Sequence, residues 1–199
     1  MRKTLKQIVK NLDLTKTSNF CPQCLSENVG SKEVKGRLVS FCNDCSYKSG
    51  QLIIFSPEMR FELTKDGQIR HFSIGAVIPR DGRYLLFKRR KFPYVWVSPA
   101  GHWDKGEEAE QAIKREVEEE AGLRVKKVEL LFEEDLSNDP CRRGTSLHHW
   151  KFFLCECEGK LQACDEAEPS TIGFYAPSDI ARMELSNPTK YFFEKMGVI

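Results

Sequence analysis

The 199-residue sequence contains no long hydrophobic run. None of its apolar stretches approaches the roughly 18 residues that a membrane-spanning helix needs. The first ten residues, MRKTLKQIVK, lack the apolar core and the small-residue cleavage site of a secretory signal peptide. The first absence excludes an integral helical membrane protein. The two together lead us to expect a soluble protein in the cytoplasm.

An excess of charge of one sign is also missing. The 31 lysines and arginines stand against 29 acidic residues, which leaves a net charge of +2. A strongly basic protein would be drawn to nucleic acid or to an anionic membrane surface, and this composition favours neither partner. The sequence also lacks internal repeats and low-complexity segments, and its 40% hydrophobic content is that of a globular protein. Its length allows one ordinary domain and a small appendage.

Cysteine, by contrast, is plentiful, with eight residues. In a cytosolic chain, cysteines indicate metal binding or free thiols before disulfides. Four of them form two Cys-x-x-Cys pairs, Cys21 with Cys24 and Cys42 with Cys45, which are 17 residues apart. This spacing is typical of a zinc site in which four sulfurs complete a closed tetrahedral shell. We therefore predict a structural zinc ribbon; redox-active cysteines are the alternative, but no thioredoxin-like helix follows either pair.

The other cysteines do not have the spacing of a metal site. Cys155 and Cys157 alternate along a predicted strand, so both side chains face the same side of it. Together with Cys141 and Cys164 they are too irregularly spaced for a second site, and we expect buried free thiols. His148, at the start of the same strand, is expected to be structural.

Four segments differ in composition along the chain. Residues 1–19 carry an amphipathic helical pattern, with apolar residues at Leu5, Ile8, Val9 and Leu12. We expect this short helix to pack on its own protein, with a partner contact as the alternative. Residues 20–50 hold the predicted zinc ribbon and 51–70 form a connector. Residues 71–199 read as a mixed α/β domain.

Within residues 71–199, runs of β-type residues alternate with helical patterns. Asp81-Gly82 is typical of a hairpin turn between two strands. The predicted strands cover 72–78, 84–88, 125–132, 150–157 and 171–175, and the predicted helices cover 107–121 and parts of 177–196.

The helix over 107–121 carries an unusual set of carboxylates. At about 100° per residue, Glu116, Glu119 and Glu120 share one face. That face overlaps the apolar stripe of the same helix, so the glutamates point partly toward the interior. Like charges a few ångströms apart repel one another, and a half-buried cluster needs a cation to neutralise it. Hard oxygen ligands favour Mg²⁺ or Mn²⁺.

The residues around this helix fit supporting roles. Asp104 followed by Glu107 resembles a capping box that would start the helix just after Asp104. Arg115 lies one turn before Glu119 and can orient it through an i,i+4 pair. Gly122 suits the left-handed position that ends a helix.

The whole segment 101–123 follows one pattern. It has Gly101, five spacers, Glu107, seven spacers, and then Arg-Glu-aliphatic-any-Glu-Glu-any-Gly-aliphatic, ending at Leu123. This pattern resembles the Nudix hydrolase motif at every fixed position. The resemblance covers about 71–199 and implies an α/β/α sandwich around a mixed sheet. It further implies Mg²⁺- or Mn²⁺-dependent hydrolysis of a nucleoside diphosphate linked to another group, such as ADP-ribose, a dinucleotide or a nucleotide sugar.

The resemblance also implies roles for single residues. In such enzymes the glutamates that match Glu116, Glu119 and Glu120 carry the metals. The residues that match Arg115 and Glu107 are mainly supportive, and a carbonyl near Gly101 adds a ligand. A homodimer would be usual for this family.

A zinc ribbon placed before a Nudix domain resembles the arrangement of the NADH pyrophosphatases. Those enzymes carry a Ser-Gln-Pro-Trp-type segment after the motif, whereas 133–140 here reads EEDLSNDP. Pro140 lies near the position of a proline found in relatives that cleave ADP-ribose. The rival function is a nucleotide- or nucleic-acid-binding regulator. The ribbon gives it little support, because Phe41 and Tyr47 are the aromatics after its first cysteine pair and no arginines cluster there.

Further candidates lie outside the motif. Basic and aromatic residues near the motif are candidates for gripping phosphate or stacking on a base: Arg89, Arg90, Trp96, Trp103 and Arg143. Glu166 and Glu168, in a loop before the last strand, are candidates for the general base that activates water.

Overall fold

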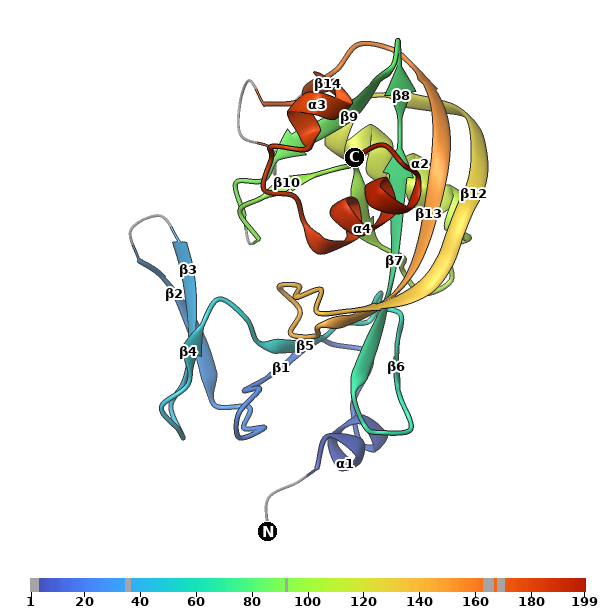
Figure 1. Cartoon of the computed structure of the whole chain (residues 1–199). Coiled ribbons are helices and arrows are strands. Elements are labelled where there is room, and N and C mark those ends of the chain that lie inside the picture. The colour runs from blue at the N-terminus through green and yellow to red at the C-terminus, as the bar shows by residue number, and fades with distance from the viewer. Residues whose placement is uncertain (1–3, 35–36, 92, 163–166, 168–170) are drawn as a thin grey trace.

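The computed structural model describes residues 4–34, 37–91, 93–162, 167 and 171–199. An N-terminal lobe, coloured blue to cyan in Figure 1, lies at one end of a larger body that holds the rest of the chain. The lobe begins with α1 (Leu5–Lys10), which is capped by Thr4 and Gln7. Ile8 of α1 is buried in a cluster with Phe20 and Phe55. The predicted packing of this helix on its own protein is therefore confirmed.

The lobe contains two small antiparallel sheets. β1 (Ser18–Phe20) pairs with β5 (Ile53–Phe55) beside α1. The second sheet has the order β2-β3-β4, formed by Val29–Val34, Arg37–Cys42 and Lys48–Ser49. Cys21 directly follows β1 of the first sheet, and Cys42 is the last residue of β3 in the second sheet.

The larger body is built on a five-stranded mixed sheet. Its order is β11-β7-β13-β12, and β6 also pairs with β7. β13 runs parallel to β7 and the other pairs are antiparallel. The strands are β6 (Phe61–Leu63), β7 (Ile69–Val77), β11 (Ala100–His102), β12 (Arg124–Ser137) and β13 (Leu147–Glu158).

The larger body contains another sheet, which continues from the end of β7. Its order is β10-β9-β14, with β8 also paired to β9. Asp81 and Gly82 both have positive φ, at 51° and 70°, so the predicted hairpin turn is confirmed. The strands are β8 (Pro79–Arg80), β9 (Arg83–Lys88), β10 (Trp96–Val97) and β14 (Gly173–Tyr175).

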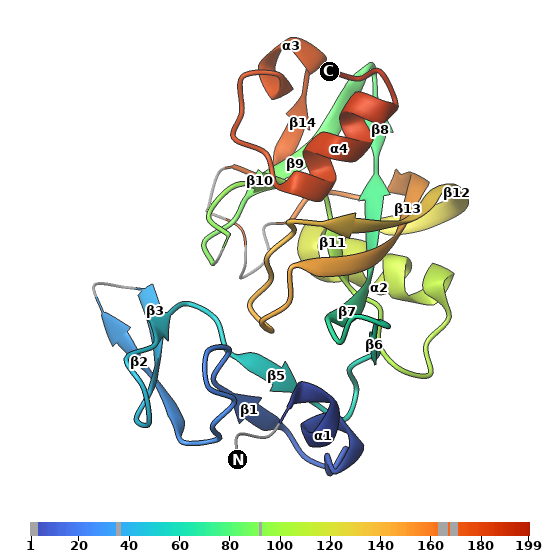
Figure 2. The same ribbon diagram turned by 60° about the horizontal axis from the view of Figure 1, so that its bottom comes forward.

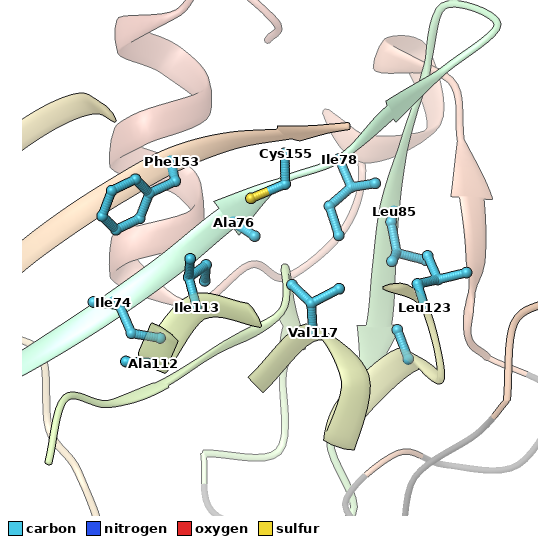
Figure 3. Packing of buried hydrophobic residues seen from close by; sticks show 11 residues of the cluster. Ile74, Ala76, Ile78, Leu85, Ala112, Ile113, Val117, Leu123, Phe153 and Cys155 are labelled. Carbon is cyan, nitrogen blue, oxygen red and sulfur yellow. The ribbon is translucent and has the colours of Figure 1, made fainter. Parts of the chain in front are cut away.

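Helices cover the sheets from two sides, as Figures 1 and 2 show. α2 (Ala109–Ala121) packs Ile113 and Val117 against Ile74 of β7 and Phe153 of β13 (Figure 3). On the other side lie α3 (Pro177–Ile180) and α4 (Asn187–Lys195), where Phe192 stacks on Phe152 at 4.3 Å between ring centroids. The expected α/β/α sandwich with a mixed sheet is confirmed. Among the described residues, no helix has the length and apolarity to cross a membrane.

The predicted start of the motif helix is wrong. α2 begins at Ala109, with Glu108 and Gln111 forming the capping box. Asp104 does not cap it, because Gly106 has a φ of 84° and interrupts any helix between Asp104 and Glu107. The predicted end is confirmed, since Gly122 is left-handed with a φ of 67°.

Candidate active site and neighbouring clusters

The three glutamates of α2 gather beside β11. Glu120 is almost completely buried, and the side chain of Glu116 is only 13% exposed. The side chain of Glu119 is 60% exposed, so it lies at the open side of the cluster. The predicted shared, partly inward face therefore holds two buried carboxylates and one that contacts solvent.

Close backbone packing places these carboxylates. A Cβ atom at Gly101 would overlap the carboxylate of Glu116, so a larger residue at this position would displace that carboxylate. The backbone N–H of Ala100 donates to Glu120 Oε2 at 2.8 Å. The backbone of Ala100 lies outside the left-handed region, which is why alanine is accepted there. The chain before α2 thus touches two of the three glutamates.

Arg115 links carboxylates of the cluster through hydrogen bonds. Its guanidinium donates to both oxygens of Glu107, at 3.0 and 3.1 Å, and to Glu116 Oε1 at 2.6 Å. The i,i+4 contact with Glu119 is present at 3.3 Å. Hydrogen bonds from Arg115 to Glu107, and then to Glu116, raise the pKa of Arg115. One cation is therefore shared among three carboxylates.

The carboxylates of the cluster outnumber the single positive charge of Arg115. Burial raises the pKa of Glu116, and the nearby charges of Glu119 and Asp104 add to the increase although Arg115 opposes it. Burial also raises the pKa of Asp104, whose Oδ1 has no hydrogen-bond partner among the described atoms. Oxygen donors that a single arginine does not neutralise are the ligand set that a hard divalent cation requires. The residues present fit Mg²⁺ or Mn²⁺.

A cavity of about 790 Å³ opens over the carboxylates. Its lining includes Gly101, Arg115 and the three glutamates, together with Arg89 and Arg143. The loop between β12 and β13, which carries Arg143, reaches toward the N-terminal lobe in both views (Figures 1 and 2). Ile54 donates its backbone N–H to the carbonyl of Arg143 at 3.2 Å. The cavity therefore lies between the carboxylate helix and the junction with the lobe.

Other predicted substrate contacts lie elsewhere. The Trp103 indole donates to the carbonyl of Glu107 at 2.6 Å, and the Arg60 guanidinium lies 3.8 Å from its ring centroid. Trp96 packs edge-on against Tyr175 at 5.1 Å. Arg90 lines a separate cavity beside β3 and β4. Of the described residues that line the 790 Å³ cavity, none is Trp96, Trp103 or Arg90. Glu166 and Glu168 lie outside the described residues, so the general-base assignment stays a prediction.

The four cysteines predicted to bind zinc come together. The sulfurs of Cys21 and Cys45 are 3.6 Å apart, as are those of Cys24 and Cys42, and all four lie within 4.8 Å of one another. Four sulfurs at about 2.3 Å from a central ion would be separated by roughly 3.8 Å. All four are free thiols. The geometry is compatible with a tetrahedral zinc site.

The remaining described thiols have two different environments, and Cys164 lies outside the described residues. Cys155 and Cys157 pack in the core under α2, and burial raises their pKa values to about 12 and about 11. Cys141, also predicted to be a buried free thiol, is free and partly buried. It lies among the imidazoles of His71, His102 and His148. Sequence spacing could not reveal this cluster, because its members come from four separate segments.

Comparison with known proteins agrees with this architecture. The family model described as NUDIX domain matches residues 69–196. The chain belongs to the NUDIX family. The matched NUDIX domain thus includes the carboxylate helix and the His/Cys cluster, whereas the cavity is also lined by residues of the N-terminal lobe such as Leu38 and Leu52.

Among curated NUDIX relatives, an ADP-ribose pyrophosphatase of Methanocaldococcus jannaschii is 34% identical over 48% of this chain and 57% of its own length. An m7GpppN-mRNA hydrolase, NUDT17, of Xenopus laevis is 33% identical over 50% of this chain and 33% of its own. An RNA pyrophosphohydrolase of Histophilus somni is 42% identical over 30% of this chain and 31% of its own. The chain thus spans about a third to just over half of the length of these relatives.

Among solved structures, a MutT NUDIX hydrolase from Burkholderia pseudomallei matches with a TM-score of 0.55 and 30% identity. It covers 63% of this chain and 96% of the other. A MutT protein from Methanosarcina mazei matches with a TM-score of 0.53 and 20% identity, over 63% of this chain and 91% of the other. The shared part is the larger body, and the N-terminal lobe is additional to it.

Proposed function

We propose that this NUDIX protein is a divalent-metal-dependent hydrolase of phosphoanhydride bonds. The single observation that carries the proposal is that Glu116, Glu119 and Glu120 all line the 790 Å³ cavity, where Arg115 contacts Glu116 and Glu119. Such a set of carboxylates is costly to keep beside a cavity unless a cation completes it. The hydrolase names of the curated relatives support the same reaction class.

Glu116, Glu119 and Glu120, with the carbonyl of Gly101, would hold Mg²⁺ or Mn²⁺. Such an ion, when bound, stabilises the developing charge of a pyrophosphate and lowers the pKa of a water molecule. Arg115 acts on the ligands and orients Glu116 through the 2.6 Å hydrogen bond. Arg89 and Arg143 bring positive charge to the cavity wall, where phosphate oxygens of the substrate would lie.

The reaction needs only water as co-substrate. The water oxygen forms a bond to one phosphorus, and the bond from that phosphorus to the bridging oxygen breaks. The bridging oxygen leaves with the second phosphate, and the proton of the water passes to a general base. Glu166 and Glu168 are our candidates for that base. Two monophosphate-type products result.

For the substrate, we propose a nucleoside diphosphate linked to another group. The relative from Methanocaldococcus jannaschii that is named ADP-ribose pyrophosphatase supports this class. Relatives named RNA pyrophosphohydrolase provide the second class, a 5′-phosphorylated RNA end. The cavity between β11, α2 and the β12–β13 loop is where we expect either substrate to bind.

The N-terminal lobe has a structural role in this proposal. We propose that Cys21, Cys24, Cys42 and Cys45 bind Zn²⁺ in a ribbon over 20–50, joined by 51–70 to the catalytic domain over 71–199. A cytoplasmic location and a homodimer remain predictions from the sequence.

A substrate panel with product analysis tests the function. The purified full chain is incubated with ADP-ribose, dinucleotides, nucleotide sugars and 5′-triphosphate RNA, with Mg²⁺, with Mn²⁺ or with EDTA. We expect cleavage of at least one linked diphosphate into two monophosphates, with no turnover in EDTA. If no substrate of the panel is cleaved with Mg²⁺ or with Mn²⁺, the proposed hydrolase function is refuted.

The same experiment addresses the rival function. Tight, salt-sensitive binding of RNA or DNA without hydrolysis would favour a nucleic-acid-binding regulator. If only the RNA end is cleaved and the small molecules stay intact, the proposed hydrolase function stands and the proposed substrate class is wrong.

A further inference from the structure

Three histidines and a cysteine lie together beside the carboxylate cluster, and they offer nitrogen and sulfur ligands where that cluster offers oxygen. One ligand atom from each of His71, His102, Cys141 and His148 lies within 4.8 Å of the others. None of the four belongs to the motif glutamates or to the two cysteine pairs. We propose that these four side chains form a separate binding site for a divalent transition metal of the Zn²⁺ class.

Strand register places the histidines on one face of the main sheet. His71 of β7 lies directly opposite His148 on the parallel neighbour β13. His102 of β11 lies opposite Ser73, which is two residues beyond His71 and therefore faces the same side as His71. Three adjacent strands thus each present one imidazole to the same point. Regular secondary structure, rather than a flexible loop, positions these three ligands.

The fourth ligand comes from the loop between β12 and β13. Cys141 lies in a tight turn in which its N–H donates to the Thr145 carbonyl at 3.1 Å. The Gln51 side chain donates to the Cys141 carbonyl at 2.7 Å. Gly144 has a φ of 82°, and a Cβ there would overlap the carbonyl of Leu52. The lobe junction therefore holds this turn over the histidines, and the Cys141 sulfur lies 3.6 Å from His71 Nδ1.

The spacing of the rings fits a common ion. The centroids of His71, His102 and His148 form a nearly regular triangle with sides of 5.5, 5.6 and 5.9 Å. Three imidazoles at tetrahedral angles, each with its nitrogen about 2.0–2.1 Å from an ion, would have centroids roughly 5 Å apart. A contraction of the centroid distances by roughly 0.5–0.9 Å would bring the rings to coordination distance.

Unsatisfied polar atoms support the same conclusion. His71 Nε2, His102 Nε2 and His148 Nδ1 are buried and have no hydrogen-bond partner among the described atoms. His148 Nδ1 lies 3.1 Å from Asp139 Oδ2, an oxygen that already accepts from the Trp150 indole at 2.9 Å. Metal-binding imidazoles commonly turn their second nitrogen toward such a carboxylate. A bound ion would engage one nitrogen of each ring and so offset part of the cost of burying three imidazoles.

The ligand types define the class of metal. Three nitrogens and one thiolate are borderline to soft ligands and contain no carboxylate, so they favour Zn²⁺ over Mg²⁺. Four protein ligands leave no open position, which is the pattern of a structural site. Such an ion would tie the loop that carries Arg143 to β11, the strand that contacts Glu116 and Glu120. The inference does not depend on the proposed hydrolytic function, because it concerns metal content alone.

X-ray absorption at the zinc edge tests the site in the unmodified full chain. The protein is loaded with Zn²⁺ and freed of unbound metal. We expect nitrogen scattering at about 2.0 Å together with sulfur scattering at about 2.3 Å, because the four-cysteine site supplies sulfur only. A spectrum explained by sulfur ligands alone would overturn the proposal.

Metal analysis of matched cysteine variants gives the second test. We expect the wild-type chain to hold one more equivalent of Zn²⁺ than Cys141→Ala, and Cys155→Ala, which removes a core thiol outside the cluster, to hold as much as the wild type. Equal zinc in Cys141→Ala and the wild type would refute the site. Should Cys141→Ala fail to fold, the absorption spectrum of the wild type still decides.

Discussion

Gly101 shows how one missing methyl group shapes the candidate site. The Glu116 carboxylate occupies the space that a Cβ at residue 101 would need. The motif glycine is thus explained by a close approach between β11 and α2, since residue 101 does not have a positive φ. The glycine and the glutamate are therefore in direct steric contact although 14 residues lie between them in the sequence.

Replacing this glycine should displace Glu116. We expect Gly101→Ala to keep the fold and to lower kcat by about 10²-fold, because a catalytic group misplaced by about 1 Å can cost that much. Steady-state hydrolysis, with circular dichroism as the folding check, measures the effect. Gly173→Ala is the matched control, since its Cβ would meet only ordinary contacts at 3.6 Å. Equal losses in both variants would contradict the steric account.

The limits of sequence interpretation are also visible at single residues. The motif glutamates and the four paired cysteines were found because their ligands lie within short, regular spacings. The second cluster could not be predicted from spacing, because strand pairing and a loop bring its members together from distant segments. Its members are His71, His102, Cys141 and His148. Trp96 and Trp103 could not be assigned from position alone, since their partners Tyr175 and Arg60 are distant in sequence.

The helix α2 is an element whose end was predicted well and whose beginning was not. Gly122 ends it in the left-handed conformation expected from the sequence. The beginning depends on Gly106 and on contacts with the connector, where Lys105 donates its N–H to the carbonyl of Glu58 at 2.7 Å. Local capping preferences could not include that tertiary contact.

Changing the helix end should reduce stability. We expect Gly122→Ala to lower the free energy of unfolding by about 1–2 kcal/mol, the cost of a left-handed conformation for an L-residue. The new Cβ would also lie 2.8 Å from the Cβ of Gln162. Urea unfolding measures the change. Gly122→Asn should lose less, because asparagine tolerates this conformation better; an equal loss would argue against the backbone explanation.

The attachment of α4 to β12 should depend on pH. Glu134 of β12 accepts a hydrogen bond from Tyr191 at 2.7 Å and pairs with Lys195. The hydrogen bond from Lys195, with that from Tyr191, lowers the pKa of Glu134 below its ordinary value of 4.5. A carboxylate with a lowered folded-state pKa stabilises the fold above 4.5, and this contribution disappears as the pH falls through the folded-state pKa.

We therefore expect Glu134→Gln to lower the urea midpoint slightly near neutral pH and to match the wild type at a pH well below 4.5. Glu129→Gln, on the same strand, provides the control, since Glu129 is exposed. A difference between Glu134→Gln and wild type that persists unchanged in acid would contradict the role of this carboxylate.

The whole molecule consists of a NUDIX body and an N-terminal lobe, in which the β2-β3-β4 sheet has little core of its own. Leu38 and Val34 in the ribbon strands are 59% and 41% exposed. So small a unit cannot bury enough apolar surface to be stable alone. Metal–thiolate bonds would supply what packing does not.

Loss of one thiolate should therefore loosen the lobe alone. We expect Cys24→Ser to reduce zinc content and to speed proteolytic cleavage within 20–50, while the NUDIX body stays resistant. Limited proteolysis with mass spectrometry measures the sites. Ser49→Ala at the edge of the same sheet serves as the control. Cleavage of Cys24→Ser at the wild-type rate would show that the ribbon is held together without this ligand.

The central claim concerns the three glutamates at the cavity, and one comparison tests it most directly. Glu119→Gln removes a carboxylate at the open side of the cluster, whereas Glu118→Gln removes the neighbouring exposed carboxylate on the same helix. With the best substrate of the panel and saturating Mg²⁺, we expect kcat of Glu119→Gln to fall by about 10²–10³-fold, a typical loss when one transition-state stabiliser is removed. Glu118→Gln should retain wild-type turnover. Equal activity of the two variants would contradict the assignment of Glu119 to the catalytic metal site.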